Sequence, residues 1–133
     1  MTSHEDAVAR LACAWLLWYP DDRMFERLPD IRAALAELPA QTRDPLTAFL
    51  GWLDEQDRMD LAREYVTTFD MRRKACPYLT YWTHGDTRNR GMAILHFKQA
   101  YLDNGFDAGD AELADHLAVV LEFAAIGDRL TGD

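Results

Sequence analysis

Apolar residues recur at intervals of three and four along most of this 133-residue chain. This spacing places side chains on one face of an α-helix, and the sequence shows no sustained alternation of period two that would indicate half-buried strands. A chain of this length is typical of one domain. We therefore predict an all-α fold, a single-domain bundle of about six helices over residues 1–133. The first apolar stripe is Val8, Leu11, Ala12, Trp15, Leu16 and Tyr19.

Proline, glycine and capping residues mark the expected helix ends. Pro29 is expected to open a new helix after a short helical piece, and Pro45, after an aspartate cap, to open the next one. Thr87 is expected to cap a long helix that ends near Gly105. The last helix is predicted to start at Asp110 and to end at Gly127.

Residues 71–86 show no clear period and are expected to form an irregular, aromatic connector. In the long helix after it, Gly91 costs about 1 kcal/mol relative to alanine, which favours close packing of that helix against a neighbour. A peptide that approaches the backbone is the other explanation. The apolar stripe of this helix is Met92, Leu95, Gln99 and Leu102, and Phe97 and Tyr101 are expected to extend its apolar surface sideways.

The formal net charge of -9 argues against nucleic acid or an anionic membrane as the main partner and favours a basic or amphipathic peptide. Residues 70–90 differ from the rest, with five basic and two acidic side chains, a net charge of +3. The arginines among these basic residues either form ion pairs with neighbouring carboxylates or form a partner-binding site. Arginine, tyrosine and tryptophan are enriched at interfaces. The basic residues are Arg72, Arg73, Lys74, Arg88 and Arg90.

Groups suited to catalysis or metal binding are sparse. Ser3 is the single serine, and Cys13 and Cys76 lack the spacing of a metal site or redox pair. The sequence has no phosphate-binding glycine loop and no apolar run near the roughly 20 residues of a membrane helix, and from its polar, acidic N-terminus we expect no signal peptide. We expect a cytoplasmic binding protein that is not an enzyme, inserts stably in no membrane and holds no metal or cofactor of its own.

Three stretches of the sequence carry a resemblance to a known family. Together they resemble the delta-subunit assembly chaperones of respiratory nitrate reductase, the NarJ branch of the TorD/DmsD-like redox-enzyme maturation proteins. The resemblance covers about residues 8–126, and its most specific part runs from His84 to Gly91. The stretches are residues 62–70, residues 78–93, and residues 112–117 with 121–123.

The resemblance implies an all-helical chaperone without enzymatic activity. It would bind the N-terminal tail of the nitrate reductase catalytic alpha subunit and support insertion of the molybdenum guanine-dinucleotide cofactor before membrane attachment. The alternatives are a chaperone for another twin-arginine-exported molybdoenzyme and a helical regulatory adaptor. Family members often have proline at the positions of Ala114 and Ala118, so the last helix is expected to begin earlier here.

Family members commonly continue with further C-terminal helices. This chain is therefore expected to be either a short member or a C-terminally truncated one. Truncation would expose an apolar face and favour self-association.

The resemblance and the aromatic connector together suggest helix-in-groove recognition of the peptide. Each aromatic candidate could instead belong to the core. The candidate peptide-binding residues are Glu64, Tyr65, Phe69, Tyr78, Tyr81, Trp82, Arg88 and Met92.

A second set of residues is predicted to hold the motif together. Glu64 or Asp70 is expected to pair with Arg88 or Arg90 and so to tie two helices, and Gly85 to supply an unusual backbone angle. The set is Asp70, His84, Gly85, Asp86, Arg90, Gly91, Asp115 and His116.

Overall fold

The computed structural model describes residues 3–85, 87–109 and 112–131. Within these residues the predicted all-α class is confirmed, with seven α-helices, one π-helical turn and one 3₁₀ turn. The β-type pairing in this part of the chain is one isolated antiparallel bridge between Tyr78 and His116. The elements are α1 (Ser3–Leu16), α2 (Asp22–Leu35), α3 (Ala40–Asp54), α4 (Arg58–Tyr65), η1 (Val66–Asp70, π), η2 (Arg73–Ala75, 3₁₀), α5 (Leu79–His84), α6 (Asn89–Asp103) and α7 (Leu117–Thr131).

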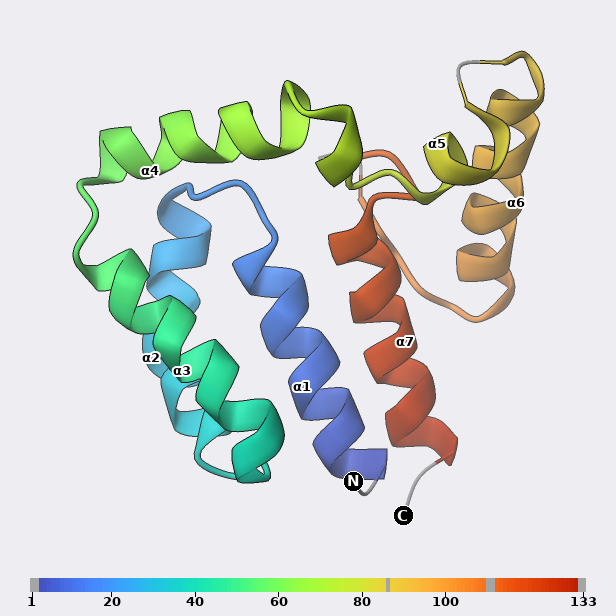
Figure 1. The fold of residues 1–133 in the computed structure, drawn as a ribbon. Coiled ribbons are helices and arrows are strands. Elements are labelled where there is room, and N and C mark those ends of the chain that lie inside the picture. The colour runs from blue at the N-terminus through green and yellow to red at the C-terminus, as the bar shows by residue number, and fades with distance from the viewer. Residues whose placement is uncertain (1–2, 86, 110–111, 132–133) are drawn as a thin grey trace.

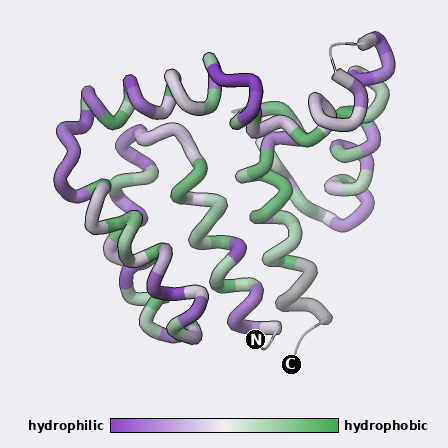
Figure 2. Tube along the Cα trace, viewed as in Figure 1, coloured by the Kyte–Doolittle hydropathy of each residue, from purple (hydrophilic) through white to green (hydrophobic). Residues whose placement is uncertain are grey.

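Helix α1 lies at the centre of the molecule, with α2 and α3 on one side and the antiparallel α7 on the other (Figure 1). Ala7 and Ala14 on α1 are buried, as are Ala118 and Ala125 on α7. Small side chains let two helix axes approach closely, which explains the tight pairing. In Figure 2 the described part of α7 is hydrophobic along most of its length, as a helix packed inside the molecule should be.

Buried side chains form two clusters on either side of α1. One cluster joins α1, α2, α3 and α4, and the other joins α6 and α7 through the loop between them. Helices α5 and α6 lie beyond α7, on the side away from α2 and α3, whereas α4 runs across one end of α1 (Figure 1). The second cluster consists of Tyr101, Phe106, Ala114 and Val119.

Helix α2 differs from its prediction because it runs through Pro29 without a break. It starts at a cap, where the Asp21 carboxylate accepts a hydrogen bond from the Met24 N–H at 3.2 Å. A proline inside a helix costs about 3 kcal/mol. The continuous buried stripe of this helix offsets that cost. The stripe is Met24, Leu28, Ile31 and Leu35.

Helix α3 also contains its proline, so the predicted start at Asp44-Pro45 is wrong. The helix begins at Ala40, directly after Pro39, and Pro45 lies in its second turn. Leu50 and Leu53 are buried on the inner face of this helix. Their burial favours one long helix over a chain break at Pro45.

Helix α7 begins at Leu117, later than predicted, and continues through Gly127 to Thr131. The predicted start at Asp110 lies outside the described residues, and the expectation of an early start was wrong. The Leu79 N–H donates to the Asp115 carbonyl at 3.1 Å, and the Leu117 N–H donates to the Pro77 carbonyl at 2.7 Å. These bonds hold Asp115 and Leu117 against residues 77–79 just before and at the start of α5, and α7 begins only at Leu117.

The second half of the predicted irregular connector is helix α5, which ends at Gly85. Gly85 has a φ of 61°, so the predicted unusual backbone angle is confirmed. The predicted cap at Thr87 is wrong, because its hydroxyl donates to the His84 carbonyl at 2.8 Å and α6 begins at Asn89. Gly105 has a φ of 70° just after α6, which agrees with its predicted role as a helix stop.

Helix α6 turns toward the core the side that carries Phe97 and Tyr101, which were expected only to extend its apolar stripe sideways. Its buried side carries Tyr101, with Ile94 and Phe97 packed beside it. The predicted apolar stripe is exposed instead: Leu102 is 65% exposed and Met92 57%. Gly91 is exposed as well, and a Cβ there would meet nothing within 4 Å, so the expected close packing is also wrong.

Candidate functional site

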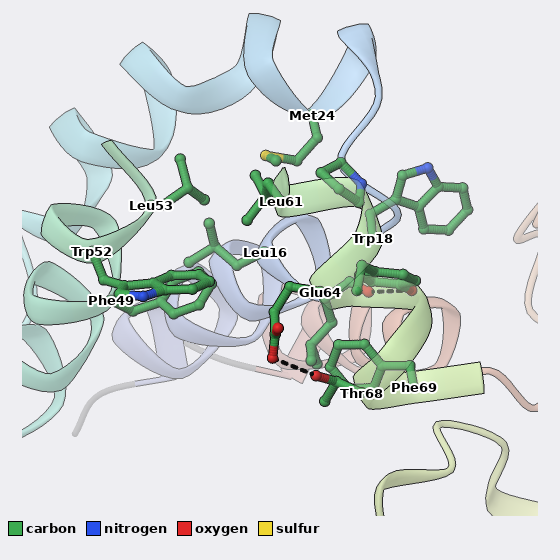
Figure 3. A pocket seen from close by; sticks show the side chains of 13 residues that line it. Leu16, Trp18, Met24, Phe49, Trp52, Leu53, Leu61, Glu64, Thr68 and Phe69 are labelled. Atoms are coloured by element: carbon green, nitrogen blue, oxygen red, sulfur yellow. Dashed lines mark hydrogen bonds between the residues drawn. The ribbon is translucent and has the colours of Figure 1, made fainter. Parts of the chain in front are cut away.

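An apolar cavity of about 220 Å³ lies where the end of α1 meets α2, α3 and α4 (Figure 3). We call it the groove. Glu64 is the one charged residue among the described residues that line it. Its lining residues are Leu16, Leu17, Trp18, Pro20, Met24, Phe49, Trp52, Leu53, Leu61, Glu64, Tyr65, Thr68 and Phe69.

Aromatic side chains form opposite walls of the groove. Figure 3 shows the rings of Phe49 and Trp52 on one side and Trp18 on the other. The Phe49 and Trp52 rings lie 5.7 Å apart, one helical turn from each other on α3, and Trp52 is 40% exposed. Large aromatic side chains left exposed beside an apolar cavity are typical of a surface that receives a partner.

Tyr65 fixes the third wall of the groove. Its hydroxyl donates a hydrogen bond to the Leu17 carbonyl at 2.9 Å, and its ring contacts Phe69 at 4.7 Å and Tyr19 at 5.4 Å. Burial raises the pKa of Tyr65, and the negative charges of Glu112 and Asp70 raise it further. The phenol therefore stays protonated and keeps α4 attached to the end of α1.

The π-helical turn η1 continues α4 and carries Phe69 into the groove. Such turns insert an extra residue into a helix and occur often at functional sites. At the edge of the groove the Glu64 carboxylate accepts a hydrogen bond from the Thr68 hydroxyl at 3.2 Å. Asp70 is exposed at the end of this turn.

The structure divides the eight predicted peptide-binding residues into two groups. Glu64, Tyr65 and Phe69 line the groove. Of the other five, Tyr78 lies just before α5 with its ring 5.2 Å from that of His116, and four lie at or near α5 and α6, beyond α7 (Figure 1). Trp82 and Met92 are exposed there, and the Trp82 indole N–H donates to the Cys76 carbonyl at 3.0 Å. The second group is Tyr78, Tyr81, Trp82, Arg88 and Met92.

Several groove residues were missed in the sequence, Trp18, Phe49 and Trp52 among them. Phe49 lies on the stripe of α3 that its spacing assigns to the core, and it is only partly covered. Helical spacing shows which residues share a face. It cannot show that this face stops short of its neighbour and leaves a cavity.

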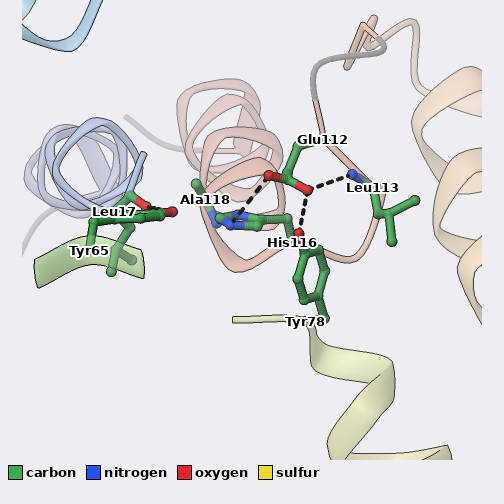
Figure 4. A network of polar contacts seen from close by, with 7 residues as sticks. All are labelled: Leu17, Tyr65, Tyr78, Glu112, Leu113, His116 and Ala118. Carbon is green, nitrogen blue, oxygen red and sulfur yellow. Dashed lines mark hydrogen bonds and ion pairs between the residues drawn. The ribbon is translucent and has the colours of Figure 1, made fainter. Parts of the chain in front are cut away.

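A network of polar contacts lies next to the groove, around His116 (Figure 4). The Glu112 carboxylate accepts hydrogen bonds from the Tyr78 hydroxyl at 2.5 Å and from the Leu113 N–H at 3.2 Å. His116 is buried, and its Nδ1 accepts the Ala118 N–H at 3.1 Å. His116 therefore caps α7, and its neutral ring carries the proton on Nε2, which lies 3.9 Å from Glu112.

Burial lowers the pKa of His116, although the negative charges of Glu112, Asp115 and Asp70 oppose that shift. Of the two effects burial is the larger. We therefore expect a neutral imidazole at pH 7, which is the form that can accept the Ala118 N–H. A structural role for this residue agrees with its place in the predicted motif.

Asp115 and Arg90 meet at Thr80, near the start of α5. One Asp115 oxygen accepts the Thr80 N–H and hydroxyl, and the Arg90 guanidinium donates to the same hydroxyl oxygen at 3.0 Å. Asp115 thus caps α5 rather than the helix that follows it. The expected link from Glu64 or Asp70 to an arginine is replaced by these contacts of Arg90 with Thr80 and, through its guanidinium, with the Tyr78 ring.

The remaining residues of the predicted motif have local roles or lie outside the described residues. The His84 ring is 2.7 Å from the Thr83 hydroxyl, and Asp86 is not described. Within the described chain, His, Cys, Asp and Glu side chains form no group of three that could hold a metal ion. No helix in that part of the chain is long and apolar enough to cross a membrane.

A family model described as nitrate reductase delta subunit matches residues 35–131. The chain belongs to the nitrate reductase delta subunit family. A Bacillus subtilis relative, named as a NarJ assembly chaperone for the nitrate reductase molybdenum cofactor, is 36% identical over 128 residues, which are 96% of this chain and 68% of that protein. The predicted family is therefore confirmed.

Two further comparisons place this member of the delta subunit family among longer proteins. NarJ of Escherichia coli, a nitrate reductase molybdenum cofactor assembly chaperone, is 32% identical over 83% of this chain and 48% of its own length. The nitrate reductase-like protein NarX of Mycobacterium tuberculosis is 41% identical over 88% of this chain, but the chain spans only 18% of NarX. The NarJ relatives are named as chaperones rather than catalysts, which agrees with the prediction of a non-enzyme.

A solved structure supports the fold of this delta subunit family member. The protein, from Archaeoglobus fulgidus and described as a redox enzyme maturation protein, matches with a TM-score of 0.67. The match covers 93% of this chain and 72% of that one, at 24% sequence identity. At this identity the likeness concerns the fold alone.

Proposed function

We propose that this chain is an assembly chaperone for a molybdenum-containing nitrate reductase and that the groove binds the N-terminal tail of the catalytic alpha subunit. The observation that carries the proposal is an apolar cavity with exposed aromatic walls in a member of the delta subunit family. Apolar side chains from one face of an amphipathic helix would enter the groove. Binding would take place in the cytoplasm, before the enzyme is attached to the membrane.

The size of the groove supports a peptide over a small-molecule ligand. Its volume of about 220 Å³ lies below the roughly 300–1,000 Å³ of typical small-molecule pockets. That space suits a few apolar side chains of a helix that lies across the opening. Phe49 and Trp52 would then be covered by the peptide, which would remove their exposed surface from water.

The chemistry of the groove supports a chaperone that holds no cofactor itself. The molybdenum guanine dinucleotide carries phosphate groups, so a site for it needs donors or positive charge. The single charged residue among the described groove residues is Glu64, which would repel phosphate. In this proposal the client enzyme carries the cofactor, and the chaperone keeps the alpha subunit ready to receive it.

Calorimetric titration with a synthetic N-terminal peptide of a nitrate reductase alpha subunit tests the proposal. Trp52→Ala is expected to weaken binding at least tenfold, because the indole forms one wall of the groove. Trp82→Ala is the matched control, an exposed tryptophan on α5 outside the groove. Lack of heat release at tens of micromolar would contradict peptide binding, and a larger effect of Trp82→Ala would move the site to α5 and α6.

A further inference from the structure

A second cavity, of about 150 Å³, adjoins the groove. We call it the side pocket. Trp18 and Tyr65 line both cavities, so the groove and the side pocket share part of their walls. Its lining differs from that of the groove because most of it is polar or charged. The lining residues are Trp18, Tyr19, Asp21, Arg23, Tyr65, Glu112 and His116.

The side pocket combines aromatic rings with carboxylates, which is a combination that suits a cation. Asp21 and Glu112 supply two negative charges and Arg23 one positive charge, which leaves a net charge of -1. An ammonium or guanidinium group is attracted both by carboxylates and by the faces of tryptophan and tyrosine rings. An anion would instead meet two like charges.

Each carboxylate of the side pocket has one oxygen engaged in the fold. Asp21 uses Oδ1 to cap α2, and Glu112 uses Oε1 to accept from Tyr78 and Leu113. The second oxygen of each makes no hydrogen bond within the described chain, although the Glu112 Oε2 lies 3.9 Å from His116. Both side chains are therefore held in position while keeping an oxygen for a ligand.

His116 presents a hydrogen-bond donor beside these carboxylates. The side chain is 2% exposed and lines the side pocket. Its Nδ1 accepts a backbone N–H, so Nε2 is the donor of the neutral ring, and 3.9 Å to Glu112 exceeds a hydrogen bond. A carbonyl oxygen of a bound chain could accept a hydrogen bond from this donor. A peptide offers this acceptor together with a cation.

Charges near the side pocket already act on its neighbours. Burial is the largest cause of the raised pKa of Tyr65, and the negative charges of Glu112 and Asp70 raise it further. Glu112 and Asp70 likewise contribute to the raised pKa of Tyr78. Both electrostatic effects come from carboxylates near the side pocket, and negative charges there favour a basic side chain.

We propose that the side pocket binds a lysine or arginine side chain of the same peptide whose apolar side chains enter the groove. Asp21 and Glu112 would take the cation, and the His116 Nε2–H would donate to a peptide carbonyl. This proposal rests on the proposed function and narrows it. The chaperone would select tails in which a basic residue lies beside the apolar face, and would bind a purely apolar helix more weakly.

A cycle of two peptides and four proteins tests the side pocket. The first peptide is the synthetic alpha-subunit tail, and the second is the same tail with citrulline for arginine and acetyl-lysine for lysine. The wild-type chain is expected to bind the neutral peptide about tenfold more weakly. Asp21→Asn and Glu112→Gln should each lose about fivefold for the natural tail and nothing for the neutral one. Asparagine can still cap α2, and glutamine can still accept from Tyr78.

Glu26→Gln is the matched control, because it removes one charge from an exposed position on α2 outside both cavities. If the wild type binds the two peptides with equal affinity, the proposal that the side pocket binds a basic side chain is wrong, whereas the proposal that the groove binds the peptide is unaffected. A loss with Glu26→Gln as large as with Glu112→Gln also overturns it, because long-range attraction then explains the result. If neither peptide binds the wild type, the proposed function fails and the side pocket fails with it. Thermal unfolding without peptide checks that each variant is folded.

Discussion

One carboxylate oxygen of Asp115 accepts two hydrogen bonds from Thr80, one from its N–H at 3.0 Å and one from its hydroxyl at 2.5 Å. Both residues are buried, and they lie 35 positions apart in the sequence. The contact joins the turn before α7 to the start of α5. Since Arg90 of α6 donates to the same hydroxyl, three segments meet at Thr80.

Asp115→Ala should lower the free energy of unfolding by about 2–4 kcal/mol, because it leaves the buried Thr80 N–H and hydroxyl without their acceptor. Urea unfolding at pH 7 measures the loss. Asp60→Ala is the control, since its carboxylate makes an exposed ion pair with Arg63 on α4 and should contribute less than about 1 kcal/mol. Similar losses in both variants would contradict the role given to Asp115.

His116 should make the protein less stable as the pH falls below about 6.5. Burial lowers its folded-state pKa below the ordinary value of 6.5, so the unfolded chain binds a proton that the folded chain does not. Stability is therefore complete above pH 6.5 and is lost as the pH falls from there toward the folded-state pKa.

The variant His116→Asn isolates this effect, because asparagine has no titration in this range and can still accept the Ala118 N–H as a helix cap. Urea unfolding between pH 5 and pH 8 should show a weaker pH dependence for the variant than for the wild type. His96→Asn, an exposed histidine of α6, should keep the wild-type profile. A wild-type profile in His116→Asn would show that other groups cause the loss.

The fold class and the end of α6 could be predicted because they depend on residues close together in the sequence. The stop at Gly105 is of this kind. The predicted stripe of α1 is only partly right, because Ala12 is buried whereas Leu11 is 41% and Tyr19 45% exposed.

The continuation of α2 through Pro29 depends on the whole stripe buried against α1 and α3. The local preference of proline for the start of a helix predicted a new helix at Pro29 instead. The start of α7 depends on Asp115 and its partner Thr80, and no local pattern reveals a contact across 35 residues.

The candidate site was found only in part for the same reason. The stretch from Glu64 to Phe69 forms one wall of the groove, and it belongs to the segment that carried the family resemblance. The opposite walls come from the turn after α1, which carries Trp18, and from α3, which carries Trp52. The walls meet only through the tertiary arrangement of four helices.

The two faces of α6 should differ sharply in their contribution to stability. Phe97→Ala is expected to lower the free energy of unfolding by about 2–4 kcal/mol, because the ring packs against the second core cluster. Leu102→Ala should change it by less than about 0.5 kcal/mol, because that side chain is 65% exposed. Urea unfolding of both variants measures the difference. A Leu102→Ala loss equal to that of Phe97→Ala would mean that the sequence-predicted face is covered after all.

Tyr65 should support the groove through its hydroxyl as well as its ring. Tyr65→Phe removes the hydrogen bond to the Leu17 carbonyl and keeps the contacts with Tyr19 and Phe69, so the free energy of unfolding should fall by about 1 kcal/mol. Affinity for the alpha-subunit peptide should fall too, because α4 is then less firmly held against the end of α1.

Tyr81→Phe on α5 is the matched control, since its hydroxyl makes no hydrogen bond among the described residues and its ring does not line the groove. Chemical unfolding gives the stability change, and calorimetric titration gives the affinity change. The expected pattern is a loss in both measurements for Tyr65→Phe and in neither for Tyr81→Phe. If Tyr65→Phe lowered stability and left peptide affinity unchanged, the hydroxyl would serve the fold alone, and the peptide would contact the groove without depending on how α4 is attached.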